Sequence, residues 1–128
     1  MKIYTGYFAY TKKYIEQGLF TISIARYNPK WYEGYSEPYL APSVDLLRRY
    51  KSGLVTEKEF EEEYIRDLDK SMLHFLLMNY PQAFKPKTEI IFLCYEKPTD
   101  FCHRHILAKY ITENYNYEVT EYDIHRKL

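Results

Sequence analysis

Two cysteines, a histidine and an arginine lie close together in the last third of the chain and could do chemistry. Cys102 is followed directly by His103 and Arg104, and Cys94 lies eight positions earlier. A thiol in the first turn of a helix tends toward a lowered pKa, because the helix dipole and nearby cations favour the thiolate. The same turn offers unpaired N–H groups to an anion. The pattern therefore predicts a nucleophile or an anion site, unless Cys102 is a small buried filler.

Two charged residues follow the two expected strands that could lead into this site, and Cys94 lies inside the second of these strands. Arg26 comes directly after an apolar run, where a guanidinium can clamp phosphate or carboxylate. Glu96 follows the second run and could accept hydrogen bonds from Arg26, position Arg104, or do acid–base work beside His103. Cys94 lies inside that run, where it packs in the core or comes close to Cys102 as a ligand-site residue or redox partner. A plain strand-end charge for Arg26 and a solvated loop position for Glu96 stay open.

Four other residues complete the predicted binding set. Ser23 lies at the end of the first apolar run, and Asp100 lies where the last helix is expected to start. Trp31 and Tyr32 occur in a long loop rich in Tyr and Pro, and such rings can stack on a base or a sugar. The alternative is that these rings only hold the loop against the core.

Metal and cofactor sites are not expected. Cys94, Cys102, His103 and His105 fall within a dozen residues, but on one helix Cys102 and His105 share a face while His103 points elsewhere. The chain has no C-x-x-C, HExxH, GxGxxG, Walker or GxSxG motif, and no C-x5-R phosphatase loop.

The elements that must position these residues alternate between strands and helices. The order predicts an α/β domain in which helices cover a mainly parallel sheet, with ligands at the carboxyl ends of the strands. Ser43 is expected to cap one helix, Thr56 and Glu59 form a capping box for the next, and Thr99 or Asp100 could cap the last. The expected strands are 2–8, 19–25, 88–95 (central) and 117–124, and the expected helices are 12–17, 42–51, 56–80 and 101–114.

Composition restricts the function classes. The chain of 128 residues suits a single domain spanning 1–128, with 46% apolar and 28% charged residues. Lys plus Arg equals Asp plus Glu at 18 each, which argues against nucleic-acid binding and a membrane surface. There is no membrane-span pattern, signal pattern or disulfide framework, so we expect a cytoplasmic protein with reduced thiols. The 16 Tyr suit interfaces, including those of a homo-oligomer.

The cysteine-bearing segment also resembles a known family. Leu93-Cys94-Tyr95-Glu96-Lys97-Pro98, followed by Phe101-Cys102-His103-Arg104-His105-Ile106-Leu107-Ala108, resembles the LLCxE…CHRxxLA signature of domain-of-unknown-function family 488, the YeaO-like proteins. The similarity extends to Leu40-Ala41-Pro42-Ser43, Leu46-Leu47, Tyr50-Lys51, Phe60 and Tyr64. It implies a Rossmann-like, three-layer α/β domain with one pocket and no established reaction. The implied pocket residues are Arg26, Glu96, Cys102, His103 and Arg104. Ile24-Ala25-Arg26 replaces the family's more common Val-Asp-Val-Arg, so no aspartate role is carried over.

The leading functional prediction is a pocket for a small, phosphate-bearing, nucleotide-derived ligand. It would lie between the turn at Cys102 to Arg104, Arg26 and the aromatic loop. Relatives of this size occur in phage and mobile elements, so the resemblance suggests a sensor or sequestering role. The main alternative is a transferase or hydrolase on a nucleotide or nucleoside, with Cys102 as nucleophile and His103 or Glu96 managing protons. Two more functions stay open, namely nucleic-acid binding through Lys30 and the basic helix at 48–51, and a structural assembly role.

Overall fold

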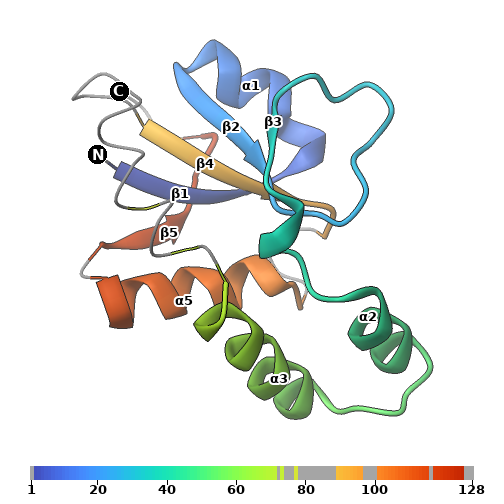
Figure 1. Cartoon of the computed structure of the whole chain (residues 1–128). Coiled ribbons are helices and arrows are strands. Elements are labelled where there is room, and N and C mark those ends of the chain that lie inside the picture. The colour runs from blue at the N-terminus through green and yellow to red at the C-terminus, as the bar shows by residue number, and fades with distance from the viewer. Residues whose placement is uncertain are drawn as a thin grey trace.

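Five parallel strands form one sheet at the centre of the computed structural model, which describes residues 2–71, 73, 77, 89–96, 101–115 and 117–125 (Figure 1). The order across the sheet is β3-β2-β4-β1-β5. The strands are β1 (Lys2–Tyr7), β2 (Leu19–Ser23), β3 (Tyr35–Ser36), β4 (Glu89–Cys94) and β5 (Val119–Glu121). The α/β class and the central place of the 88–95 segment are thereby confirmed, in a Rossmann-like domain.

Helices cover both faces of this sheet and complete three layers. α1 lies on one face, whereas α3 and α5 cover the other and α2 packs beside α3 (Figure 1). Their bounds are α1 (Thr11–Glu16), α2 (Val44–Lys51), α3 (Glu57–Asp69) and α5 (His103–Tyr115), with 3-10 turns at Phe8–Tyr10 and Pro38–Leu40. Within the described ranges, no helix has the length and apolar character that a membrane crossing requires.

Alternation along β4 decides which face of the sheet each of its side chains meets. Ile90 and Phe92 pack in the core beneath α3 and α5, whereas Ile91 and Leu93 pack in the core beneath α1. Because successive strand side chains point to opposite faces, Cys94 falls on the α3 and α5 side. The thiol of Cys94 therefore lies at the carboxyl end of β4, on the face of the sheet where α5 begins.

The strand order creates a switch point between β1 and β4. From β1 the chain crosses through α1 to β2 on one side, and from β4 it crosses through α5 to β5 on the other. Ligands of open parallel sheets bind at the carboxyl ends of the two strands where the order reverses. Tyr7 of β1 and Cys94 of β4 are register partners at that end.

The predicted helix caps agree with the structure. The Ser43 hydroxyl accepts a hydrogen bond from Leu46 N at 3.0 Å, as expected of an N-cap. Thr56 and Glu59 bond reciprocally in a capping box at the start of α3.

The single helix predicted for 56–80 is wrong at its centre. α3 ends at Asp69, and the Ser71 hydroxyl donates to Leu68 O at 2.7 Å while it accepts from Leu73 N at 3.2 Å. A serine that binds nearby backbone groups competes with the helical ladder and starts a new turn. Leu73 and Leu77 are helical and buried, and the rest of the predicted 72–80 stretch lies outside the described residues.

The outer parts of the sheet also differ from the prediction. The last strand covers only Val119–Glu121 instead of 117–124, and the predicted loop at 27–39 contains the two-residue strand β3. Both are edge strands, which are commonly short because a long unpaired edge invites association with other chains. Hydrophobic alternation is weak over two or three residues, so such strands escape pattern reading.

Gly6 of β1 allows α1 to pack closely on the sheet. A Cβ at this position would lie 2.6 Å from Ile91 Cδ1 and 2.8 Å from the Tyr14 hydroxyl oxygen. We expect Gly6→Ala to lower the free energy of unfolding by about 1–3 kcal/mol, the usual cost of overpacking. Urea denaturation measures this change, with the exposed Thr120→Ala as a control expected to stay within about 0.5 kcal/mol of wild type. An unchanged midpoint for Gly6→Ala would contradict the packing argument.

Candidate functional site

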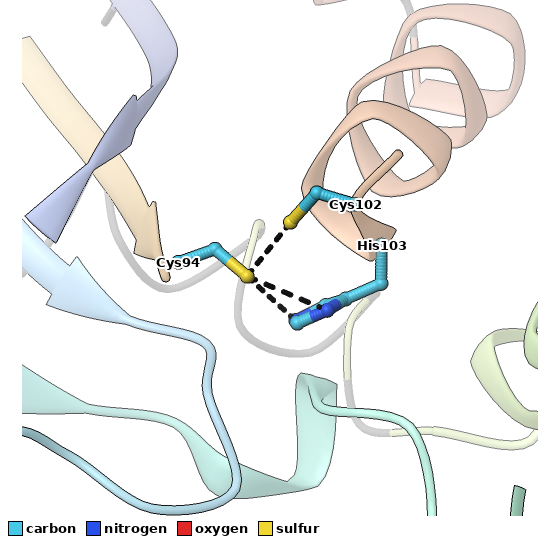
Figure 2. A group of neighbouring side chains, drawn as sticks. All are labelled: Cys94, Cys102 and His103. Carbon is cyan, nitrogen blue, oxygen red and sulfur yellow. Dashed lines mark hydrogen bonds between the residues drawn. The ribbon is translucent and has the colours of Figure 1, made fainter. Parts of the chain in front are cut away.

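The two cysteines meet at the carboxyl end of the central strand. Cys94 Sγ at the end of β4 and Cys102 Sγ just before α5 lie 2.8 Å apart, and both thiols are free. Figure 2 shows the Cys94 sulfur facing both the Cys102 sulfur and the ring of His103. Of the two alternatives left open for Cys94, core packing and closeness to Cys102, the structure shows both, because Cys94 is buried and its sulfur faces Cys102 at the switch point of the sheet.

Cys102 occupies the N-cap position of α5. The helix begins at His103, and His105 N donates to Cys102 O at 3.1 Å. Arg104 N lies 3.5 Å from Cys102 Sγ, and Arg104 Nη1 lies 3.4 Å from the same sulfur. The predicted start at Phe101 is thus two residues early, because Cys102 caps the helix with its side chain. Thr99 and Asp100, the predicted caps, lie outside the described residues.

The surroundings favour the thiolate form of Cys102 and the protonated form of Cys94. Burial opposes charge on Cys102, but a hydrogen bond from Cys94 and the positive charge of Arg104 lower its pKa to about 3. Burial raises the pKa of Cys94, and the neighbouring Cys102 raises it further. The negative charge of the pair therefore resides on Cys102, where the α5 N-terminus and Arg104 stabilise it.

His103 is held in one orientation by the backbone after β2. Its Nε2 lies 2.8 Å from Ile24 O, and since a carbonyl can only accept, Nε2 carries the proton. Nδ1 then lies 3.5 Å from Cys94 Sγ. The ring edge of Tyr64 packs on the imidazole with centroids 5.6 Å apart, and the Tyr64 hydroxyl donates to Leu40 O. The imidazole is therefore fixed beside the sulfurs.

Glu96 connects the sulfur pair with the surface. Glu96 Oε2 lies 3.2 Å from Cys94 Sγ and offers the Cys94 proton a second acceptor beside Cys102, although Glu96 as a residue is exposed. Burial of the carboxylate and the negative charge of Cys102 raise its pKa. A carboxylate whose pKa is raised accepts a proton from a thiol more readily, so Glu96 can exchange protons between Cys94 and solvent.

Arg104 is committed to another partner. Its side chain is fully buried and makes two hydrogen bonds to Glu121, Nε to Oε1 and Nη2 to Oε2, both at 3.1 Å. Thr5 Oγ1 donates to Glu121 Oε1 at 2.7 Å, and Arg104 Nη1 donates to Glu96 O at 2.7 Å. The guanidinium of Arg104, the predicted ligand clamp, is therefore already bound by a carboxylate. Among the described residues of the site, it contacts Cys102 Sγ and Glu96 O.

Arg26 keeps one donor without a partner. Its Nη2 donates to Pro42 O at 3.1 Å and, more weakly, to Ala41 O at 3.4 Å. Its Nε is buried and has no hydrogen-bond partner within the part of the chain that is described. Arg26 lies two residues after Ile24, whose carbonyl accepts a hydrogen bond from His103. The role of Arg26 as a ligand clamp stays a prediction.

The structure places Trp31 and Tyr32 on the other face of the sheet and uses the Ser23 side chain in the turn after β2. Ser23 is buried, contacts Asn28 Oδ1 through its hydroxyl and accepts from Ala25 N, which stabilises the turn after β2. Trp31 and Tyr32 pack edge-on against Phe8 and line a cavity of about 530 Å³ together with residues of α1. This cavity lies on the α1 face, so the sheet separates it from the cysteines.

The same cluster contains side chains that can bind a metal ion, and their arrangement corrects the prediction made for His103. The ligand atoms of Cys94, Cys102 and His103 lie within 4.8 Å of one another. The expectation that His103 points away from Cys102 is wrong, because Cys102 precedes α5 and helical spacing does not apply to it. Two sulfur ligands of one tetrahedral zinc would lie about 3.8 Å apart. The observed 2.8 Å and the adjacent Arg104 cation disfavour a metal cation, so we assign none. The expected lack of a metal stays a prediction that metal analysis of the purified protein checks.

Sequence reasoning missed three residues that support the site. Tyr64 orients His103, and Thr5 and Glu121 hold Arg104. The sequence marked Tyr64 as an apolar helix position and as part of the family resemblance, but gave it no role at the site. No local signal indicated Glu121, because the final segment 117–124 also contains Glu118, Thr120 and Asp123.

The family of the chain follows from a sequence comparison. A family model described as "Active DUF488-N3 subclade" matches residues 10–115, which include every member of the thiol cluster. Comparisons with curated proteins and with solved structures gave no match. The extent of the match confirms the resemblance, and the chain belongs to domain-of-unknown-function family 488, in its DUF488-N3 subclade.

Proposed function

We propose that the protein is an enzyme in which Cys102 attacks a small phosphate-bearing substrate, a nucleotide or a nucleoside derivative. Attack by sulfur would form a covalent intermediate, which water or an acceptor then releases, so the reaction is a hydrolysis or a group transfer. The observation that carries this proposal is the environment of the Cys102 sulfur. It lies beside Arg104 N, Arg104 Nη1 and the Cys94 thiol, which together favour a thiolate at neutral pH.

Turnover is favoured over binding alone by the state of the two arginines. A phosphate-sequestering pocket would use both Arg26 and Arg104 as clamps, but Arg104 is occupied by Glu121. Its charge instead acts on Cys102, where it supports a nucleophile. The description of the matching subclade as active is consistent with this interpretation.

Arg26 supports the choice of an anionic substrate. A buried guanidinium N–H without a partner is costly, and a ligand oxygen is a natural acceptor for it. Arg26 lies two residues beyond Ile24, whose carbonyl orients His103, and the proposal therefore places the anion between Arg26 and the thiol pair. This geometry supports a substrate whose phosphate binds Arg26 while its reacting atom faces Cys102.

Glu96 and His103 support proton transfer in the same reaction. Glu96 has a raised pKa and reaches the sulfur pair while exposed to solvent, so it can donate a proton to a leaving group. His103 keeps its Nε2 proton on Ile24 O and serves to position the sulfurs.

The test is a turnover screen of the purified protein against nucleosides and mono-, di- and cyclic nucleotides, with products separated by chromatography. We expect at least one substrate, and Cys102→Ser should reduce kcat by about a thousandfold or more, the usual effect of losing a nucleophile. Arg26→Ala should raise KM more than it lowers kcat, because its contact is present in ground and transition states alike.

Arg48→Ala is the matched control for Arg26→Ala. Arg48 is an exposed arginine on α2, and its removal should leave KM unchanged. Full activity in Cys102→Ser would refute the nucleophile role. A screen without any product would refute the nucleotide substrate class.

A further inference from the structure

Cys94 places a second thiol next to Cys102, which a single nucleophile does not need. A cysteine that only forms a covalent intermediate requires one thiolate, yet a second thiol lies 2.8 Å from it. A disulfide bond is about 2.05 Å long, so the sulfurs need to approach by less than about 1 Å to bond. The two thiols come from the end of β4 and the start of α5, which hold them side by side (Figure 2).

The two sulfurs have different chemical roles available to them. Cys102 receives the Arg104 N–H and guanidinium donors, so its sulfur attacks first. Cys94 lies at the end of the central strand, where its sulfur faces both Cys102 and the Glu96 carboxylate. A buried thiol held against an attacking thiolate is placed to displace whatever Cys102 has bound.

We propose that the protein catalyses thiol–disulfide exchange with low-molecular-weight disulfides, in which Cys102 attacks and Cys94 resolves the mixed disulfide. In the first step the Cys102 thiolate attacks one sulfur of an external disulfide such as glutathione disulfide. A Cys102–glutathione disulfide forms, and one glutathione thiolate leaves. The external disulfide bond breaks as the new one forms, so no further oxidant is required.

In the second step Cys94 attacks the Cys102 sulfur. The Cys94 proton passes to the Glu96 carboxylate, which lies 3.2 Å from the sulfur, and the second glutathione leaves as a thiolate that takes up a proton. The products are a Cys94–Cys102 disulfide and two reduced glutathione molecules. The protein is oxidised by two electrons and the glutathione disulfide is reduced by two.

Glu96 determines how fast the second step proceeds. Burial raises the pKa of Cys94, so its thiol needs a base before it can attack. The geometry gives that role to Glu96, because its carboxylate touches Cys94 and its residue is open to solvent for proton release. Glu96→Gln keeps the shape of the side chain and removes the base.

The experiment follows the intact mass of the protein after addition of glutathione disulfide. The wild type should lose two hydrogens without lasting glutathione addition, and dithiothreitol should reverse the change. Cys94→Ser should stop with one glutathione attached, and Cys102→Ser should remain unmodified. In Glu96→Gln the glutathionylated intermediate should persist at least about tenfold longer than in wild type, whereas Glu62→Gln, an exposed glutamate on α3, should behave as wild type.

Lasting glutathionylation of the wild type would overturn the proposal, as would the absence of reaction. Unchanged persistence of the intermediate in Glu96→Gln would overturn the role of the base. The wild-type measurement does not depend on the folding of any variant. The exchange also needs no phosphate-bearing substrate, so its outcome is separate from that of the nucleotide screen.

Discussion

Glu121→Gln should lower the free energy of unfolding by about 3–5 kcal/mol, the usual cost of removing one partner from a buried ion pair. Arg104 is 0% exposed and directs two hydrogen bonds to Glu121, whose side chain is 24% exposed. The glutamine amide keeps the shape of the Glu121 side chain but carries no charge, so the buried positive charge of Arg104 loses its counter-charge. Partial hydration of the Glu121 position places the expected effect at the low end of this range.

Chemical denaturation with a constant m-value measures this loss. Glu118→Gln is the matched control, since Glu118 is exposed three residues earlier and should cost less than about 0.5 kcal/mol. Glu121→Gln tests how much the ion pair contributes to stability. Arg104→Lys keeps a positive charge near Cys102 but loses the two parallel hydrogen bonds to Glu121, so it tests the contribution of their geometry. Equal stability of Glu121→Gln and the control would show that the pair contributes nothing.

Alkylation of Cys102 by iodoacetamide should be nearly independent of pH between about pH 5 and 9. An ordinary thiol with a pKa of about 8.5 is only about 0.3% thiolate at pH 6, so its rate rises about tenfold per pH unit up to that pKa. The pKa of Cys102 is lowered to about 3, so its thiolate persists throughout this range and is lost only in acid. Because a weaker base is also a weaker nucleophile, the shape of the profile is diagnostic and the absolute rate is not.

Single-cysteine variants isolate the two thiols, because the chain has only two cysteines. Cys94→Ser leaves Cys102 alone with a hydroxyl donor beside it, and its alkylation profile should stay flat. Cys102→Ser leaves the buried Cys94, whose raised pKa should keep it unreactive until strongly alkaline pH. The same Cys94→Ser chain in guanidinium chloride should regain the steep profile of a free thiol. A steep profile in the folded Cys94→Ser protein would contradict a stabilised thiolate.

The elements that bury apolar side chains at regular intervals could be predicted from the sequence. β4 with its run of Ile, Phe and Leu was recognisable as a central strand, and the caps at Ser43 and Thr56 located two helix starts. The break after Asp69 could not be predicted from periodicity, because Leu73 and Leu77 continue the apolar spacing across it. There a local serine hydrogen bond overrides the helical pattern.

The residue types of the site were predictable, but their partners were not. Cys102, His103 and Glu96 do gather near one strand end, as strand and helix order implied. The pairing of Arg104 with Glu121 depends on β5 lying beside β1, a long-range contact that no local pattern contains. The separation of Trp31 from the cysteines likewise depends on which face of the sheet the loop covers.

The parallel sheet has a consequence for how the chain acquires its structure. Its strand pairings join segments that are separated in sequence, and Lys2 of β1 pairs with Glu89 of β4. During synthesis β1 therefore has to wait for most of the chain before its neighbours exist. Long-range pairings of this kind close large loops at an entropic cost, and proteins dominated by them fold in milliseconds to seconds. The Cys94 thiol reaches Cys102 only when that slow assembly is complete, so nascent chains carry two ordinary, separate cysteines.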